Sequence, residues 1–196
     1  MSQLDRQKWD RRYSEGAYAG RRHPSALLAQ WVTDFPVGKA LDVACGAGRN
    51  ALFLAGRGYR VDALDISAEA LSRGEKEAQA RGVQVNWVQH DLDEALQLEG
   101  GYQLALLIRY VDLQLLQQLG SLLAPGGILV CEEHLESNQD VIGPANPAFR
   151  VSSGDLKKAA DGLEILHLEE GLVTEPDGRI ASLARLVARR SAAHSK

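Results

Sequence analysis

Cysteine is scarce in this sequence, and long apolar runs are missing from it. The two cysteines, Cys45 and Cys131, each lie in or beside an apolar, strand-like run, which is typical of buried thiols in a reducing compartment. The five histidines show no spacing typical of a metal site, so none is expected. Because the sequence shows neither an apolar signal-peptide core nor a run of membrane-spanning length, we expect a cytoplasmic protein.

Positive charge is also in short supply. The net charge is −4 and the isoelectric point lies near 5.7, whereas proteins that bind a nucleic-acid backbone usually have basic surfaces. We therefore expect neither a nucleic-acid partner nor a membrane partner, and nothing in the sequence indicates an oligomeric state. The 196 residues, 45% of them apolar, suit one globular domain that buries a sizeable core.

Apolar runs of strand length alternate with helical patterns through the first two-thirds of the chain. This alternation predicts an α/β fold: a doubly wound, mostly parallel sheet with helices on both faces. The chain then closes with two strand-like segments, 163–169 and 180–189, which predict an antiparallel hairpin. We expect a helical cap at residues 1–36, the main domain at 37–189 and a disordered tail at 190–196.

A glycine-rich turn follows the first predicted strand. Residues 39–55 read as a short buried strand, this turn and the start of a helix. Gly46 permits a sharp turn, and Gly48 permits close approach of a ligand to the backbone. The segment from Gly46 to Ala51 also fits the dinucleotide fingerprint with alanine in the last position. The turn therefore predicts a nucleoside-bearing cofactor, and NAD is one candidate.

Three features distinguish between the candidate cofactors: Asp42, Asp91 and the terminal hairpin, which a plain dinucleotide domain is not expected to have. Asp65 ends the second strand, where a carboxylate can bind the ribose hydroxyls of any adenosine ligand. Asp42 precedes the glycines, where it would repel a pyrophosphate and attract a cationic ligand. Asp91 follows the third strand and can accept a hydrogen bond from the adenine amino group. A ligand with an amino acid group, a ribose and an adenine fits this order, and S-adenosylmethionine has these parts.

At these positions the sequence resembles the class I S-adenosylmethionine-dependent methyltransferases. The similar segments are 41–48, 63–67, 89–92 and 123–129. The front of the chain, from Trp9 to Ser25, is similar to the small-molecule branch that includes the tellurite-resistance and thiopurine methyltransferases. The resemblance implies a Rossmann-like sheet of seven strands, the last antiparallel, and S-adenosyl-L-methionine as the cofactor.

The resemblance also implies which residues bind this cofactor. Gly46 and Gly48 flank its methionine part, and Asp42 lies near its amino group. The ribose and adenine contacts fall on two short segments, Asp65 with Ile66 and Asp91 with Leu92. Trp9 and Tyr13 are expected to close over the cofactor, and Arg109 to face the cofactor or the substrate.

The implied activity is methyl transfer to a small-molecule acceptor by in-line displacement. A general base is needed only if the acceptor is protonated at the working pH. The candidates for catalysis are Arg109, Tyr110 and His134. Arg109 and Arg150 are also candidates for binding an anionic substrate, although an ion pair and a solvated loop charge explain them equally well.

Two other functions fit the same residues. The first is an NAD-dependent oxidoreductase, which would bind NAD and not S-adenosylmethionine. The second is a catalytically silent module that retains the cofactor fold as a sensor or a partner subunit. Such a module would bind the cofactor without turning over any acceptor.

Overall fold

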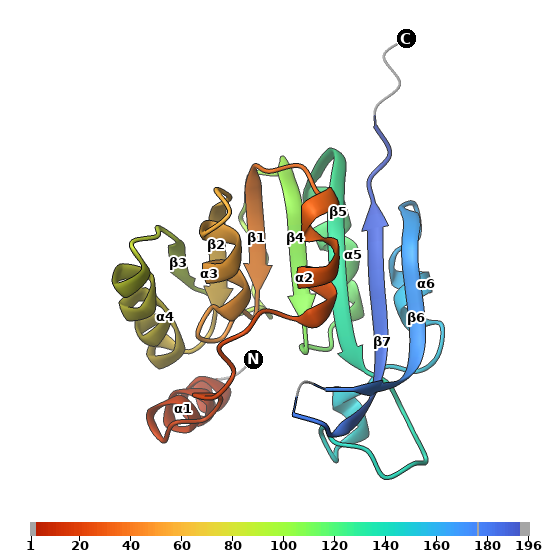
Figure 1. Ribbon diagram of the computed structural model, residues 1–196, viewed down its shortest axis with the longest axis horizontal. Coiled ribbons are helices and arrows are strands. Elements are labelled where there is room, and N and C mark those ends of the chain that lie inside the picture. The colour runs from red at the N-terminus through yellow and green to blue at the C-terminus, as the bar shows by residue number, and fades with distance from the viewer. Residues whose placement is uncertain (1–2, 176, 193–196) are drawn as a thin grey trace.

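The computed structural model describes residues 3–175 and 177–192, and a seven-stranded sheet runs through this part of the chain (Figure 1). The strand order is β3-β2-β1-β4-β5-β7-β6. The first five strands in chain order pair in parallel, and β7 pairs antiparallel with both β5 and β6. The strands are β1 (Lys39–Val43), β2 (Arg60–Asp65), β3 (Asn86–Gln89), β4 (Tyr102–Ile108), β5 (Leu123–His134), β6 (Glu164–Thr174) and β7 (Ile180–Arg189). The predicted fold class is thus confirmed, including the antiparallel hairpin.

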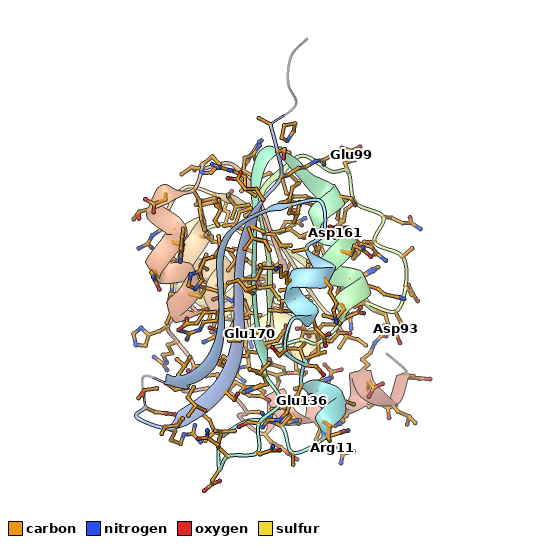
Figure 2. All side chains as sticks on the ribbon, turned by 90° about the vertical axis from the view of Figure 1, so that its right-hand side faces the viewer. Arg11, Asp93, Glu99, Glu136, Asp161 and Glu170 are labelled. Carbon is orange, nitrogen blue, oxygen red and sulfur yellow. The ribbon has the colours of Figure 1, made fainter. Side chains whose placement is uncertain are left out.

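Helices cover both faces of this sheet, as Figure 2 shows edge on, with α2 on one side and α5 and α6 on the other. The helices are α1 (Gln3–Ser14), α2 (Ala26–Trp31), α3 (Arg49–Ala55), α4 (Ala68–Arg81), α5 (Leu113–Leu122) and α6 (Asp155–Ala159), with short 3-10 turns η1 (Val32–Asp34) and η2 (Pro147–Phe149). Side chains cap two of the helices. The Ser67 hydroxyl accepts from the Ala70 N–H, and the Asp112 carboxylate accepts from the Leu115 N–H. None of the helices in the described ranges has the length and apolar character needed to span a membrane.

Alternate residues of each central strand face two separate apolar clusters. In β4, Leu104 and Leu106 pack with residues of α2, α3 and α4, whereas Ala105 and Leu107 pack with residues of α5 and α6. All four side chains are almost fully buried. Burial of each leucine contributes about 1.5–3 kcal/mol to folding, so both faces hold the strand ends in place.

Helix α1 lies away from both faces, at the edge of the sheet where β1 and β4 end (Figure 1). It is tied to α4 by polar contacts. Asp10 Oδ1 accepts from the Ser67 hydroxyl at 2.7 Å and from the Glu69 N–H at 3.3 Å. Arg73 donates to the main-chain oxygens of Tyr13 and Ala17 at 3.3 and 3.0 Å. Helix α2 instead packs into the core. The two helices of the predicted cap therefore pack in different ways, and the boundary of this cap at residue 36 stays a prediction.

Two further parts of the chain bear on the predicted boundaries. No helix forms between β3 and β4, so the predicted alternation is interrupted there. At the C-terminus, residues 193–196 of the predicted tail lie outside the described residues. Arg190, also in that segment, is hydrogen-bonded through its main chain to Gly126 and Gly127, both at 2.8 Å. The ordered chain therefore continues past β7.

Candidate functional site

The glycine turn between β1 and α3 has left-handed backbone at three positions. Ala44, Gly46 and Gly48 have φ angles of 53°, 57° and 72°. Glycine adopts this conformation at no steric cost, whereas for alanine it costs about 1–2 kcal/mol. The sequence identified the two glycines, but the strained position at Ala44 carries no sequence signal. Strain retained beside a turn of this kind is a common feature of binding sites.

Two carboxylates accept hydrogen bonds from main-chain N–H groups in and beside this turn. Asp65 Oδ2 accepts from the Gly46 N–H at 2.7 Å, and its Oδ1 accepts from the Ser67 N–H at 2.9 Å. Asp42 Oδ2 accepts from the Ala51 N–H at 3.0 Å, inside the first turn of α3. Both side chains are buried.

Burial outweighs these hydrogen bonds in setting the proton affinity of the two carboxyls. It raises the pKa of Asp42 to about 7 and raises the pKa of Asp65 above its usual range. The Asp65 carboxylate also raises the pKa of Asp42, whereas the Arg49 cation lowers it. A cationic ligand would stabilise the ionised form of both groups.

Tyr13 of α1 covers the glycine turn. Its side chain is buried, and a Cβ added to Gly46 would collide with its hydroxyl group. Its ring contacts those of Trp9 and Tyr18, with centroid distances of 6.4 and 5.8 Å. Burial and the nearby Asp65 raise the pKa of Tyr13 above its usual value, so the phenol keeps its proton. Tyr13 thus lies at the turn, and Trp9 is one ring further away.

The remaining predicted adenosine contacts lie at the ends of β2 and β3. Ile66 and Leu92 are buried apolar residues, and the main-chain oxygen of Ile66 accepts from Gln89 Nε2 at 3.0 Å. Asp91 is half-buried, and its Oδ1 accepts from the Asp93 N–H at 3.1 Å.

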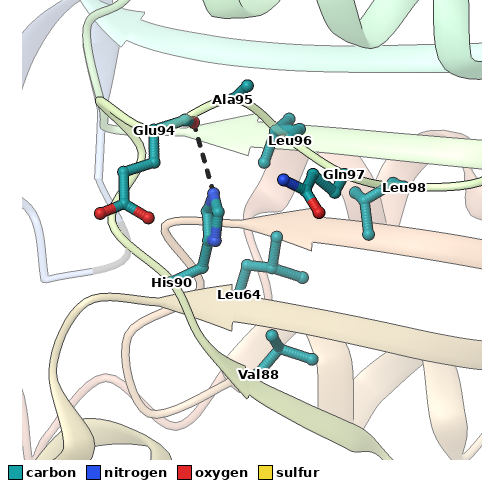
Figure 3. A pocket seen from close by; sticks show the side chains of 8 residues that line it. All are labelled: Leu64, Val88, His90, Glu94, Ala95, Leu96, Gln97 and Leu98. Carbon is teal, nitrogen blue, oxygen red and sulfur yellow. Dashed lines mark hydrogen bonds between the residues drawn. The ribbon is translucent and has the colours of Figure 1, made fainter.

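A hollow of about 320 Å³ adjoins these residues, under the chain that replaces a helix between β3 and β4 (Figure 3). Its lining residues are Leu64, Val88, His90, Glu94, Ala95, Leu96, Gln97 and Leu98. His90 Nε2 lies 3.4 Å from the main-chain oxygen of Glu94. Leu64 and His90 directly precede Asp65 and Asp91, so the hollow lies near the ends of β2 and β3.

Arg109 leaves β4 in an unusual direction. Alternation along β4 would point residue 109 to the side of α5 and α6, but its φ of 64° redirects the chain. Its Nε donates to Glu132 Oε1 at 3.1 Å, and its Nη2 donates to Glu175 Oε1 at 2.5 Å. Its Nη1 lies within 3.2 Å of both ring nitrogens of His134. A left-handed non-glycine residue costs about 1–3 kcal/mol, which here places a guanidinium on the side of Glu132.

The three candidates for catalysis separate into two groups. Arg109 and His134 are in contact, and burial together with Arg109, Arg150 and Arg21 lowers the pKa of His134 to about 3, so its ring is neutral. Tyr110 packs on the opposite face of the sheet, with its N–H donating to Glu133 Oε1 at 3.1 Å.

Burial and nearby charges raise the pKa of two groups on that opposite face. Burial and then the Asp112 and Asp91 carboxylates raise the pKa of Tyr110 to about 12. Burial also raises the pKa of Glu133 well above its usual range, and its Oε2 has no hydrogen-bond partner among the described residues. Tyr110 therefore lies on the face of the sheet near Asp91, whereas His134 lies on the other face, beside Arg109.

The polar groups around the turn consist mainly of acceptors. Asp42, Asp65 and Asp91 offer carboxylate oxygens, and a dinucleotide pyrophosphate would be repelled by them. This set fits a ligand that carries positive charge and several hydrogen-bond donors. Within the described residues, no group of three or more His, Cys, Asp or Glu side chains is placed to hold a metal ion.

Comparisons with known proteins give the family and the fold of similar chains. Residues 40–127 match the family model described as a methyltransferase domain. A stretch of 95 residues, 45% of the chain, is 33% identical to the ubiquinone biosynthesis O-methyltransferase of Cronobacter sakazakii (strain ATCC BAA-894). The match spans only 39% of that relative's length.

Solved structures share the fold across nearly the whole chain. TehB from Haemophilus influenzae superposes with a TM-score of 0.70 and 20% identity, covering 95% of this chain and 67% of that one. Magnesium protoporphyrin IX methyltransferase from Synechocystis PCC 6803 with bound SAH has a TM-score of 0.65 and 20% identity, covering 97% and 88%. At these identities the likeness establishes the fold.

Proposed function

Because the chain contains a methyltransferase domain at residues 40–127 and has the fold of the class I S-adenosylmethionine-dependent methyltransferases, we propose that it transfers a methyl group from S-adenosyl-L-methionine to a small-molecule acceptor. The observation that carries this proposal is the pair of buried carboxylates at the glycine turn. Asp42 and Asp65 have raised pKa values and lack a full counter-charge. A cationic ligand with a ribose would supply both the charge and the donors.

The chain's own residues divide the work of holding this cofactor. Asp65 would accept hydrogen bonds from the ribose hydroxyls, and Asp42 would lie at the amino end with Gly46 and Gly48. Asp91 would accept from the adenine amino group, between the apolar side chains of Ile66 and Leu92. Tyr13, backed by Trp9, would exclude water from the turn.

When bound, the cofactor supplies a methyl group on a positively charged sulfur, which is already reactive. The protein's task is then to hold a nucleophile in line, and positioning alone can remove about 7–11 kcal/mol of a barrier. His134 stays neutral, and its ring lies against Arg109 Nη1, so it would contact the acceptor as an uncharged polar group. Tyr110 keeps its proton, so it acts as a donor, and Arg109 orients His134.

The names of similar proteins support the same class of reaction. The curated relative is an O-methyltransferase of ubiquinone biosynthesis, and one structural neighbour was solved with bound SAH. Both act on small molecules according to their names, so a small-molecule acceptor is proposed here. Two buried, unpaired cysteines favour a cytoplasmic location.

Ligand binding tests this proposal most directly. We expect S-adenosylmethionine and S-adenosylhomocysteine to raise the melting temperature of the protein and NAD to leave it unchanged, because a ligand that binds only the native state stabilises it. Stabilisation by NAD alone would identify an oxidoreductase. Formation of S-adenosylhomocysteine across a panel of hydroxyl, thiol and amine acceptors then separates an enzyme from a silent cofactor-binding module.

Asp65 provides the site-specific form of this test. Asp65→Asn keeps an acceptor for the Gly46 N–H but removes the charge, and we expect a loss of about 10–100-fold in S-adenosylhomocysteine affinity, since hydrogen bonds to charged groups contribute about 1.5–3 kcal/mol. Asp161→Asn, on an exposed residue beyond α6 (Figure 2), is the matched control. Isothermal titration calorimetry measures both. Equal affinities for the two variants would mean that Asp65 does not bind the ribose.

A further inference from the structure

Positive charge gathers at one end of the proposed site. The group, named here the arginine cluster, comprises Arg109 and Arg150 beside His134, with Arg21 and Arg49 near enough for their charges to act on it. These residues come from the loop after α1, the start of α3, the end of β4, the segment after η2 and the end of β5. Arg49 interacts with Asp42 as well as with Arg21 and Arg109. The cluster therefore adjoins the end of the glycine turn where Asp42 lies.

The nearby carboxylates neutralise only one part of this cluster. Glu132 is shared by Arg109 and Arg185, and Glu175 is bonded to Arg109. Within the described residues, no carboxylate lies at ion-pair distance from the side chains of Arg21, Arg49 or Arg150. Among these residues, the three arginines thus have no direct ion pair, while Asp177 and Asp42 act on Arg21 and Arg49 from a longer distance.

Arg150 is held rigidly without losing its charge. Its Nε donates to the main-chain oxygen of Pro144 at 2.9 Å, and its Nη1 donates to that of Leu135 at 2.8 Å. Its Nη2 lies beside Gly143, where an added Cβ would be 3.1 Å from this nitrogen and 2.7 Å from His134 Nδ1. The guanidinium is fixed next to His134 by neutral carbonyl groups, as a binding group for an anion would be.

The cluster is electrostatically strained. Burial and then Arg21 lower the pKa of Arg49, and burial with three arginines lowers the pKa of His134. An anion placed among these side chains would relieve the repulsion. It would also lie next to the cofactor end of the site, where an acceptor must be.

On the basis of the proposed function, we propose that the methyl acceptor carries a carboxylate or phosphate group, and that Arg21, Arg49 and Arg150 bind this group beside His134. Guanidinium groups bind either anion through charge-assisted hydrogen bonds, often two at a time. Fixing the anion at this point directs the rest of the acceptor toward the glycine turn. The acceptor's reacting atom is then held near the methyl group by binding energy from a remote part of the molecule.

Simple anions test the cluster in the intact protein. With the protein saturated by S-adenosylhomocysteine, titration calorimetry with benzoate, benzamide and inorganic phosphate compares a carboxylate, its neutral analogue and a phosphate. We expect benzoate or phosphate to bind and benzamide not to bind, and the stronger of the two anions identifies the acceptor's group. Binding of benzamide as tight as that of the stronger anion, or no binding of either anion, would overturn the proposal.

Two variants locate the binding site. Arg150→Gln should weaken anion binding by at least about tenfold, equivalent to 1.4 kcal/mol, and Arg21→Gln, on an exposed side chain, by about threefold. Arg81→Gln, at the exposed end of α4, is the control and should bind as the native protein does. If neither Arg21→Gln nor Arg150→Gln weakens binding, the cluster is not the anion site. If the native protein does not bind S-adenosylhomocysteine, that result would instead contradict the proposed function itself.

Discussion

At the scale of single residues, the site depends on ionisable groups held where water is scarce. Asp42 and Asp65 are buried under the glycine turn, and His134 is buried among arginines. In each case burial is the largest cause of the pKa shift, and it disfavours the charged form. These groups therefore reduce the stability of the ligand-free protein, and a charged ligand recovers that free energy on binding.

Asp42 allows this cost to be measured. Its pKa is about 7 in the folded protein and 3.8 ordinarily, so between these values the unfolded chain is ionised at Asp42 while the folded chain keeps the proton. The free energy of unfolding therefore falls by about 1.4 kcal/mol per pH unit as pH rises through this window. Asp42→Asn cannot ionise, so we expect it to gain about 2–4 kcal/mol relative to the native protein between pH 4.5 and pH 8.

Urea unfolding of the ligand-free proteins at both pH values measures this gain. Asp161→Asn, on an exposed carboxylate, is the control and should show no such gain. Asp42→Asn should also bind S-adenosylmethionine more weakly, because the carboxylate charge is gone. A stability difference between Asp42→Asn and the native protein that is the same at both pH values would contradict the raised pKa.

At the scale of elements, β3 contributes to the position of the glycine turn, and α4 holds α1. Gly48 packs against the Trp87 ring of β3, and the same ring meets Gly74 of α4. Helix α1 is held by the Asp10 contacts to the start of α4. Both contacts join segments far apart in the sequence, and both set the shape of the cofactor end of the site.

Gly48→Ala tests the first contact. The residue has φ of 72°, and a Cβ there would collide with the Trp87 ring. We expect a loss of about 2–4 kcal/mol in the free energy of unfolding, combining left-handed backbone strain with overpacking. Gly58→Ala is the matched control, since its φ is 86° but the nearest atom to an added Cβ is Val37 Cγ1 at 3.9 Å.

Denaturant unfolding of the two variants separates strain from overpacking. Gly58→Ala should lose about 1 kcal/mol, and the excess loss in Gly48→Ala measures the collision with Trp87. The double variant Gly48→Ala, Trp87→Leu should regain part of that excess. Equal losses at Gly48 and Gly58 would show that the ring moves aside without cost.

Asp10→Ala tests the docking of α1. Removal of the Asp10 carboxylate breaks the contacts to Ser67 and Glu69, so α1 should undock more often while the sheet stays folded. We expect severalfold faster trypsin cleavage at Arg11 or Arg12 and severalfold weaker binding of S-adenosylhomocysteine, because Tyr13 leaves the glycine turn. Glu15→Ala, at an exposed position just after α1, is the control. Cleavage rates that match in the two variants would mean that Asp10 does not hold the helix.

At the scale of the whole molecule, one sheet carries two apolar clusters and one site. The proposed cofactor end lies between α1 and the ends of β1, β2 and β3, while Arg109 and His134 of the arginine cluster lie at the ends of β4 and β5. Cys45 and Cys131 belong to different clusters, on opposite faces of the sheet. Both thiols are buried, and burial raises the pKa of each well above its usual value.

The two thiols report on cooperative unfolding. We expect neither to react with a disulfide reagent in the native protein and both to react in denaturant. Saturation with S-adenosylhomocysteine at 100 times its dissociation constant adds about 2.7 kcal/mol and should slow labelling of both thiols about 100-fold. Asp65→Asn should lose this protection. A Cys131 labelling rate that S-adenosylhomocysteine leaves unchanged would indicate local opening of one face.

The sequence by itself determined the features that depend on local chemistry. Strand and helix periodicity and the glycine turn each depend on neighbouring residues, so their signals are complete within a short window. The fold class followed from their order. The three carboxylates Asp42, Asp65 and Asp91 could be predicted as one group because parallel strands end at the same edge of a sheet.

Only the tertiary structure decided which side chains meet at the acceptor end. Arg21, Arg49 and Arg150 come from separate loops and a helix start, and no sequence spacing joins them to His134. The direction of Arg109 follows from one left-handed residue at the end of β4, which strand periodicity cannot indicate. Local patterns specify each element, whereas long-range packing specifies how loops from different elements converge, and the proposed anion site depends on that convergence.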